Sequence, residues 1–96
     1  MTPEKLTIEQ LPSLPKWKRI DGTKLKQTIH FKDFVEAFSF LTTIAFEAEK
    51  MGHHPEMLSV YNRIEFVLTT HDVQGLSNLD VAMAQIIDAH AARVVG

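Results

Sequence analysis

Side chains suited to proton transfer gather in the second half of this 96-residue chain. They are Glu49, His53, His54, Tyr61, His71 and Asp80, with Pro55 directly after the two adjacent histidines. Histidine is the side chain whose unperturbed pKa lies near neutral pH, so paired imidazoles give and take protons under mild conditions. Two histidines in different environments can serve as the acid and the base of one reaction. The residue types therefore indicate general acid–base catalysis.

The spacing of these residues points to a family. Three residues separate Glu49 from His53, five separate Pro55 from Tyr61, nine separate Tyr61 from His71, and eight separate His71 from Asp80. With this spacing, the chain resembles the pterin-4a-carbinolamine dehydratase family from about residue 17 to the C-terminus. The resemblance implies a two-layer α+β fold with four strands, a short N-terminal helix, and a dimer or tetramer.

The resemblance also implies an activity. The enzyme would be a hydro-lyase that removes water from a 4a-hydroxytetrahydropterin and yields the quinonoid dihydropterin, as in tetrahydrobiopterin recycling. Such a dehydration needs a general acid for the leaving hydroxyl and a general base for the adjacent nitrogen. The pterin is the substrate, and neither a cofactor nor a metal ion is expected.

The family pattern assigns roles to individual positions. It implies that His53, His54 and His71 are the catalytic and pterin-contacting imidazoles. We expect His53 and His71 to transfer the protons and His54 to hold the substrate, while the assignment of acid and base stays open. The further positions of the pattern, expected to bind substrate, are Glu49, Pro55, Met57, Tyr61 and Asp80.

Three of these positions carry more specific expectations. Glu49 lies four residues before His53, so on a continuing helical turn it would share a face with that histidine and orient it. Asp80 has a competing structural role, because Ser77 and Asp80 have the spacing of a helix capping box. Met57 departs from the family, which usually has an aromatic residue there; methionine still packs against a ring through its polarisable sulfur.

Two other interpretations compete with catalysis. The pair His53-His54 alone would suit a polar loop, and with His71 it would offer three nitrogen ligands to a metal ion. The metal site is the weaker alternative, since adjacent histidines rarely point at one ion and the i, i+4 spacing of helical zinc sites is absent. We expect His30 and His90 to be structural or exposed.

The elements that must position these residues follow from the hydrophobic pattern. Asp21-Gly22 predicts a turn between strands at 16–20 and 24–30, and a second tight turn joins strands at 57–61 and 63–70. Apolar residues at helical spacing predict helices over 31–51 and from the Ser77 cap to about residue 94. The order hairpin, helix, hairpin, helix predicts one four-stranded antiparallel sheet covered by helices on one face, an α+β domain.

The helical pattern also predicts which side chains are buried. Phe31, Phe34 and Phe38 belong to the stripe expected to form the core of the first helix. Leu79, Met83 and Ile87 are candidates for an apolar edge left over for oligomer contacts. That edge would also serve the alternative function, a non-catalytic dimerisation partner of a transcription regulator.

Composition sets the remaining expectations. We expect one domain over 1–96, with 1–15 forming a short helical or irregular segment in which Thr7 caps a turn. The net charge of −2 argues against nucleic-acid binding, and the basic cluster of Lys16, Lys18, Arg19, Lys24 and Lys26 is expected to be a solvated hairpin surface. The chain has no cysteine, no signal-peptide pattern and no apolar run that could span a bilayer, so a cytoplasmic location is expected.

Overall fold

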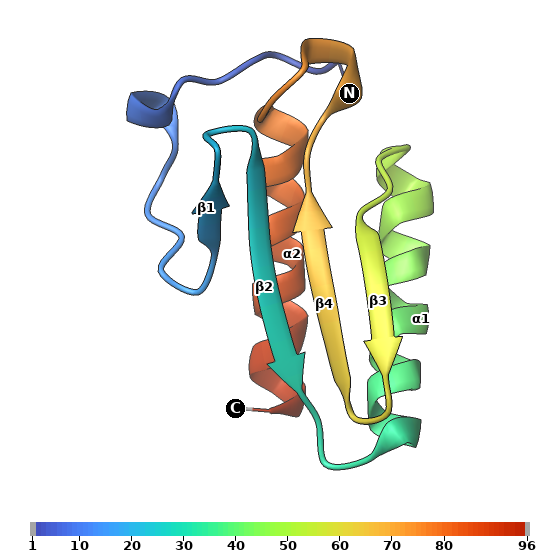
Figure 1. Cartoon of the computed structure of the whole chain (residues 1–96). Helices are drawn as coiled ribbons and strands as arrows, with labels where there is room; N and C mark the ends of the chain where they lie inside the picture. Colours follow the sequence, from blue (N-terminus) through green and yellow to red (C-terminus); the bar gives the residue numbers. More distant parts are fainter. Residues whose placement is uncertain (1, 96) are drawn as a thin grey trace.

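A computed structural model describes residues 2–95 of the chain. Its elements are the short 3-10 helix η1 (Ile8–Gln10), strands β1 (Lys18–Ile20) and β2 (Lys24–His30), helix α1 (Phe34–Met51), strands β3 (Glu56–Val60) and β4 (Arg63–Leu68), a second 3-10 helix η2 (His71–Val73), and helix α2 (Asn78–Val94). The strands form one antiparallel sheet in the order β1-β2-β4-β3, with both long helices on one face (Figure 1). The predicted two-layer α+β fold is confirmed.

Both hairpin turns form where the sequence predicted them. Asp21 and Gly22 have positive φ angles of 55° and 67°, the left-handed conformation that an Asp-Gly pair tolerates. Tyr61 has a φ of 50° in the two-residue turn that joins β3 to β4. Strand β4 ends at Leu68, two residues before the predicted boundary, because Thr70 pairs with Gly75 in an isolated bridge instead of continuing the sheet.

Helix α1 begins three residues later than predicted. The Asp33 side chain accepts a hydrogen bond from the backbone N–H of Glu36 and caps the first turn. Phe31 lies before this cap, and its backbone N–H donates to the carbonyl of Asn62 at 2.7 Å. The helix ends at Met51, and the left-handed Gly52 that follows caps the last turn, as the sequence predicted.

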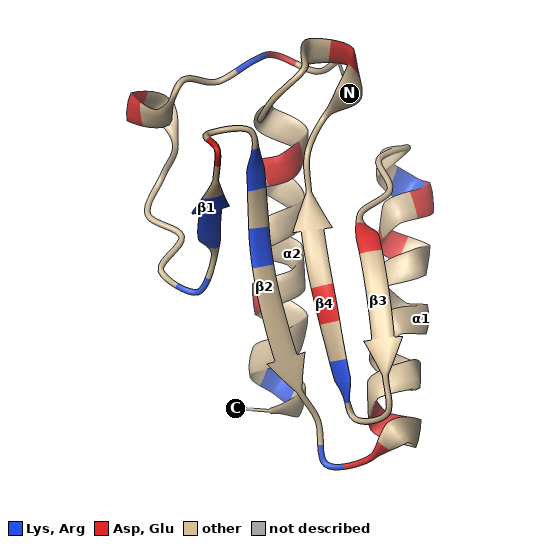
Figure 2. Ribbon diagram, in the orientation of Figure 1, with Lys and Arg blue, Asp and Glu red and all other residues tan. Residues whose placement is uncertain are grey.

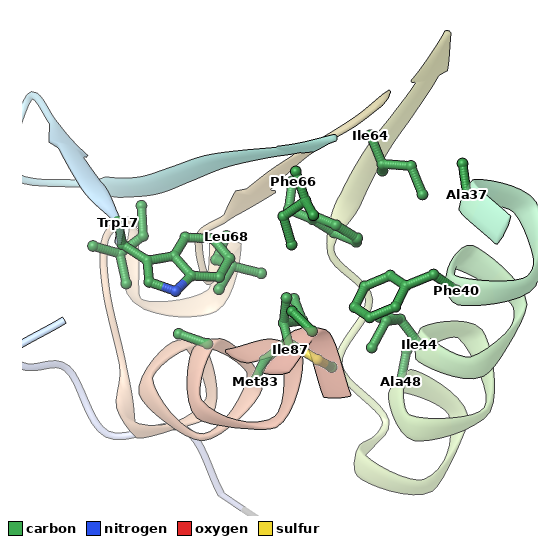
Figure 3. Packing of buried hydrophobic residues seen from close by; sticks show 14 of the residues in the cluster. Trp17, Ala37, Phe40, Ile44, Ala48, Ile64, Phe66, Leu68, Met83 and Ile87 are labelled. Carbon is green, nitrogen blue, oxygen red and sulfur yellow. The ribbon is translucent and has the colours of Figure 1, made fainter. Parts of the chain in front are cut away.

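The core lies between the sheet and the two helices (Figure 3). Ile64, Phe66 and Leu68 point inward from β4 and are fully buried, as their alternation along the strand predicted. Helix α1 covers them with Ala37, Phe40, Ile44 and Ala48, and α2 covers them with Met83, Ala84 and Ile87. Burying each large side chain stabilises the fold by about 1.5–3 kcal/mol. This packing fixes the helix ends that carry the candidate site.

Two predictions about helix faces are wrong. Phe34 and Phe38 were expected in the core, yet they are 49% and 52% exposed. Apolar residues surround much of α1, and the face that meets the sheet includes Ala37 and Phe40, which the predicted stripe left out. Conversely, the expected oligomer edge of Leu79, Met83 and Ile87 is buried, because this side of α2 packs against β4 and α1.

Charged residues are spread over the surface, with basic residues concentrated on β1 and β2 (Figure 2). Lys18, Arg19 and Lys24 are exposed, and Lys26 forms an ion pair with Glu65 of the neighbouring strand at 2.6 Å. Neither α1 nor any other helix within residues 2–95 is long and apolar enough to cross a bilayer.

Candidate active site

The predicted histidines meet in a pocket of about 440 Å³. The pocket lies where α1 ends, β3 begins and β4 leads into η2, at the upper end of the molecule in Figure 1. Its walls include His53, His54 and His71, with Thr69 and Thr70 beside them. The fold thus brings together imidazoles that are up to 18 positions apart, counted from His53 to His71.

Chain geometry at the end of α1 places the first two histidines. The left-handed Gly52 turns the chain, and the backbone N–H of His53 donates to the carbonyl of Ala48 at 3.2 Å. His53 therefore lies against the end of the helix, and its side chain is 9% exposed. His54 stays exposed, and Pro55 leads the chain into β3.

A six-residue loop places the third histidine. Thr70 and Gly75 pair through two backbone hydrogen bonds of 2.8 Å and 3.3 Å, which close the loop that holds η2. His71 is the first residue of η2 and is exposed at the pocket. Solvent therefore reaches His71 directly, whereas His53 lies at the buried side of the same pocket.

His53 is held by a buried carboxylate. Its Nε2 lies 2.7 Å from Oδ1 of Asp80, a residue with no exposed surface. The other oxygen of Asp80 accepts from the Thr70 hydroxyl at 2.7 Å and from the Ser77 backbone N–H at 2.9 Å. A buried carboxylate is tolerated when such partners replace its water. Asp80 is thus both a cap of α2, as predicted, and the partner of His53.

Glu49 lies beside a different histidine from the one expected. Its carboxylate is 3.4 Å from Nε2 of His54, and both side chains are mostly exposed. The prediction that Glu49 orients His53 is therefore wrong, because the left-handed Gly52 ends the helical spacing and the His53 ring is bonded to Asp80 instead. An exposed pair of this kind contributes little to stability, typically below about 1 kcal/mol.

The remaining predicted positions lie outside the pocket walls. Pro55 is half-buried, and Met57 lies on the helix-covered side of β3, opposite Phe66 and packed against the core. Tyr61 is 66% exposed in the turn after β3, roughly 16 Å along the strand from Glu56 at the pocket. The substrate-binding roles of Pro55, Met57 and Tyr61 stay predictions.

A second hollow lies between α1 and the end of α2. It has a volume of about 510 Å³ and is lined by residues that include Lys32, Glu36, His90 and Arg93. His90 is hydrogen-bonded there to Glu47 at 2.7 Å, which supports its predicted structural role. Across residues 2–95, the structure contains no cluster of three or more His, Asp or Glu side chains that could hold a metal ion.

Thr70 is a site residue that sequence analysis missed, as are Thr69 and Asp72 in the pocket walls, and Ser77 was recognised only as a helix cap. The Thr70 and Ser77 hydroxyls are buried and lie 2.7 Å apart, next to Asp80. The available signals were the position of Thr70 directly before His71 and the Ser77-x-x-Asp80 cap. Neither signal reveals that the start of α2 packs against the end of α1.

A buried histidine–aspartate pair and two further histidines lie around one pocket of this small α+β domain. The chain belongs to the pterin 4 alpha carbinolamine dehydratase family, whose model matches residues 1–90. This membership confirms the resemblance inferred from the spacing of the histidines.

Known proteins of similar sequence and structure agree with the family. A Burkholderia ambifaria (strain MC40-6) protein is 46% identical over 89 residues, covering 88% of this chain and 87% of the relative. A Synechococcus sp. (strain WH7803) protein is 52% identical over 77 residues, covering 80% and 82%. Both carry the name "Putative pterin-4-alpha-carbinolamine dehydratase". The crystal structure of a transcriptional coactivator/pterin dehydratase from Brucella melitensis superposes with a TM-score of 0.74 at 39% identity, covering 78% of this chain and 81% of that one.

Proposed function

We propose that this protein dehydrates a 4a-hydroxytetrahydropterin to the quinonoid dihydropterin by histidine acid–base catalysis. The observation that carries the proposal is the meeting of His53, His54 and His71 in one pocket, with His53 bonded to a buried carboxylate. Family membership and the names of the relatives supply the substrate class. We further propose that the pterin is the substrate and that no cofactor takes part.

The chemistry needs two proton transfers. The bond between C4a and the hydroxyl oxygen breaks as a general acid protonates the leaving group, and a general base takes the proton from the adjacent ring nitrogen. The products are water and a carbon–nitrogen double bond. Each positioned acid or base contributes about 10²–10⁴-fold in rate. His53 and His71 are the proposed proton carriers, and His54, at the exposed wall, is the proposed substrate contact.

The proposal is tested by the decay of enzymatically generated 4a-hydroxytetrahydropterin, followed by absorbance. The wild-type protein should accelerate the decay, and His71→Ala should lose that acceleration by orders of magnitude with little change in melting temperature. His30→Ala is the matched control, because His30 is also an exposed histidine and lies outside the pocket walls. No acceleration by folded wild-type protein, or equal rates for the two variants, would contradict the proposal.

Protein binding is a second candidate function, which one feature of α1 favours. Phe34, Val35, Phe38 and Phe46 are between 49% and 72% exposed, although exposed aromatic clusters are uncommon on monomeric proteins. The Phe34 and Phe38 rings contact each other in a tilted arrangement, with their centroids 5.8 Å apart. We propose that this face forms the contact of a homodimer or homotetramer, or alternatively holds a transcription regulator, as the description of the Brucella protein as a coactivator suggests.

Light scattering after size exclusion tests the oligomer. The wild-type protein should elute as a dimer or tetramer, and Phe38→Asp should shift it towards the monomer, because a charge cannot be buried in an apolar contact without a partner. Lys50→Asp is the control, since it changes charge at an exposed site of the same helix. A wild-type monomer would contradict the oligomer and leave the transcription regulator as the alternative occupant of this face.

A further inference from the structure

The hydrogen bonds around Asp80 form a chain that continues behind the histidine. Thr70 Oγ1 lies 2.7 Å from Asp80 Oδ2 and 2.7 Å from Ser77 Oγ. Ser77 Oγ in turn accepts from the backbone N–H of Leu79 at 3.1 Å. Thr70, Ser77 and Asp80 are 5%, 0% and 0% exposed, so water does not compete for these bonds.

The number of protons available fixes which atom donates in each of these hydrogen bonds. A hydroxyl has one proton to donate, and that of Thr70 goes to Asp80. Ser77 must therefore donate its proton to Thr70 while it accepts from Leu79. Two donors then point at Oδ2 of Asp80, from Thr70 and from the Ser77 backbone, and Oδ1 remains for the imidazole. An acceptor at Oδ1 requires the proton of His53 to sit on Nε2.

Helix capping accounts for only some of these hydrogen bonds. Ser77 and Asp80 would cap α2 without Thr70, because the two bonds of the capping box join those residues to the backbone. The Thr70 hydroxyl contacts Asp80 and Ser77 and takes no part in that box. The backbone of Thr70 also closes the loop that carries His71. One residue thus supports both proposed proton carriers, the first through Asp80 and the second through the loop.

We infer that Thr70 and Ser77 are positioning residues: the Ser77 hydroxyl holds the Thr70 hydroxyl, which in turn holds Asp80, so that His53 keeps its proton on Nε2 and offers Nδ1 to the substrate as a proton acceptor. This inference rests on the proposed function and adds the roles of two residues and of one ring nitrogen. A neutral imidazole has one donor and one acceptor nitrogen, so fixing the donor at Nε2 makes Nδ1 the acceptor. Loss of the Thr70 donor leaves the Ser77 backbone N–H as the remaining bond at Oδ2, so the carboxylate is held less firmly. The imidazole then spends part of its time away from Asp80, where either ring nitrogen can carry the proton.

The test compares Thr70→Val, which keeps the shape and removes the hydroxyl, with Thr70→Ser, which keeps the hydroxyl. Thr43→Val is the matched control, because it removes a threonine hydroxyl that donates to the Ser39 carbonyl on α1, away from the pocket. Each protein is assayed for kcat and KM with 4a-hydroxytetrahydropterin. The ¹⁵N shifts of the His53 imidazole are recorded without substrate. If Thr70→Val does not fold, Thr70→Ala, which removes the same hydroxyl, takes its place in the comparison with Thr70→Ser.

We expect Thr70→Val to lower kcat about tenfold, a part of the ~10²–10⁴-fold that a positioned base contributes, while KM stays near the wild-type value. The His53 shifts should change from a single Nε2-protonated form to a mixture of tautomers. Thr70→Ser should restore both properties, and Thr43→Val should alter neither.

Two results separate this inference from the proposed function. Unchanged kcat and unchanged His53 shifts in Thr70→Val would overturn the positioning role even if the wild-type protein is a dehydratase. A wild-type protein without dehydratase activity would overturn the proposed function. In that case, a tautomer change in Thr70→Val would still support the positioning of His53 by Thr70.

Discussion

Replacing Asp80 by asparagine changes one atom at the centre of the site. The amide has the shape of the carboxylate, but one oxygen becomes an NH₂ donor. The remaining oxygen can keep the bonds from Thr70 and from the Ser77 backbone, which places the NH₂ against Nε2 of His53. Nε2 must then accept, and the proton moves to Nδ1. Nδ1, the nitrogen that we propose accepts the substrate proton, would then become a donor.

Asp80→Asn should lower both the turnover and the stability of the protein. Loss of a correctly placed proton acceptor should lower kcat by about 10²–10⁴-fold. Hydrogen bonds to charged groups contribute about 1.5–3 kcal/mol and neutral ones about 0.5–1.5, so Asp80→Asn should destabilise the fold by about 1–2 kcal/mol. A loss of 1 kcal/mol lowers the melting temperature of a domain of this size by about 4–8 °C. The protein should stay folded at room temperature and be nearly inactive.

Asp88→Asn is the control that separates the two effects. Asp88 also lies on α2, where it accepts from the Trp17 indole at 3.1 Å and from the Gln27 amide at 3.0 Å, away from the pocket. It should show a melting shift of similar size with wild-type kcat. The assay is turnover of 4a-hydroxytetrahydropterin together with thermal unfolding by circular dichroism. Wild-type kcat in Asp80→Asn, or equal loss of kcat in both variants, would refute the reasoning.

Three further outcomes are expected. The hydrogen bond to His90, followed by that to Lys50, lowers the pKa of the Glu47 carboxyl from its ordinary value of 4.5. The ionised carboxylate therefore stabilises the fold fully above pH 4.5, and this contribution is lost as the pH falls through the lowered pKa. Glu47→Gln should therefore show a shallower loss of stability below pH 4.5 in urea titrations, and an unchanged slope would speak against the pair. Chelators should leave turnover unchanged, whereas a loss that zinc restores would favour a metal site. Phe66→Ala should cost about 3–5 kcal/mol, because the fully buried ring contacts both layers, and a smaller shift in the urea midpoint would mean that the core collapses around the cavity.

Local signals in the sequence predicted the elements well. Asp21-Gly22, the Ser77-x-x-Asp80 box and Gly52 each act within a few residues, and each forms the turn, cap or helix end that its chemistry favours. The alternation along β4 also fixed its buried face. These features depend on neighbours along the chain, so a single sequence is sufficient to predict them.

Features that depend on packing could not be predicted in the same way. Helix α1 has apolar residues around much of its circumference, and only contact with the sheet selects Ala37 and Phe40 over Phe34 and Phe38. The small Ala37 side chain allows the close approach of helix and sheet, which periodicity alone does not reveal.

In the candidate site, too, local signals were predictable and tertiary contacts were not. The family spacing predicted the three histidines, and the fold brings them to one pocket. The partner of His53 was misassigned to Glu49, four residues away, because helical spacing is visible in the sequence. The true partner, Asp80, is 27 residues away and reaches His53 through the packing of α2. Thr70 lies in the site because it contacts Asp80 of the same helix.

Binding of a pterin among the three histidines can be measured directly. The chain has five histidines, three in the pocket walls and two, His30 and His90, outside them. Titration of ¹⁵N-histidine-labelled protein with an unreactive pterin that lacks the 4a-hydroxyl should shift the imidazole resonances of His53, His54 and His71 and leave those of His30 and His90 in place. Shifts confined to His90 or His30, or no shift at saturating pterin, would contradict the assignment of this pocket as the pterin site.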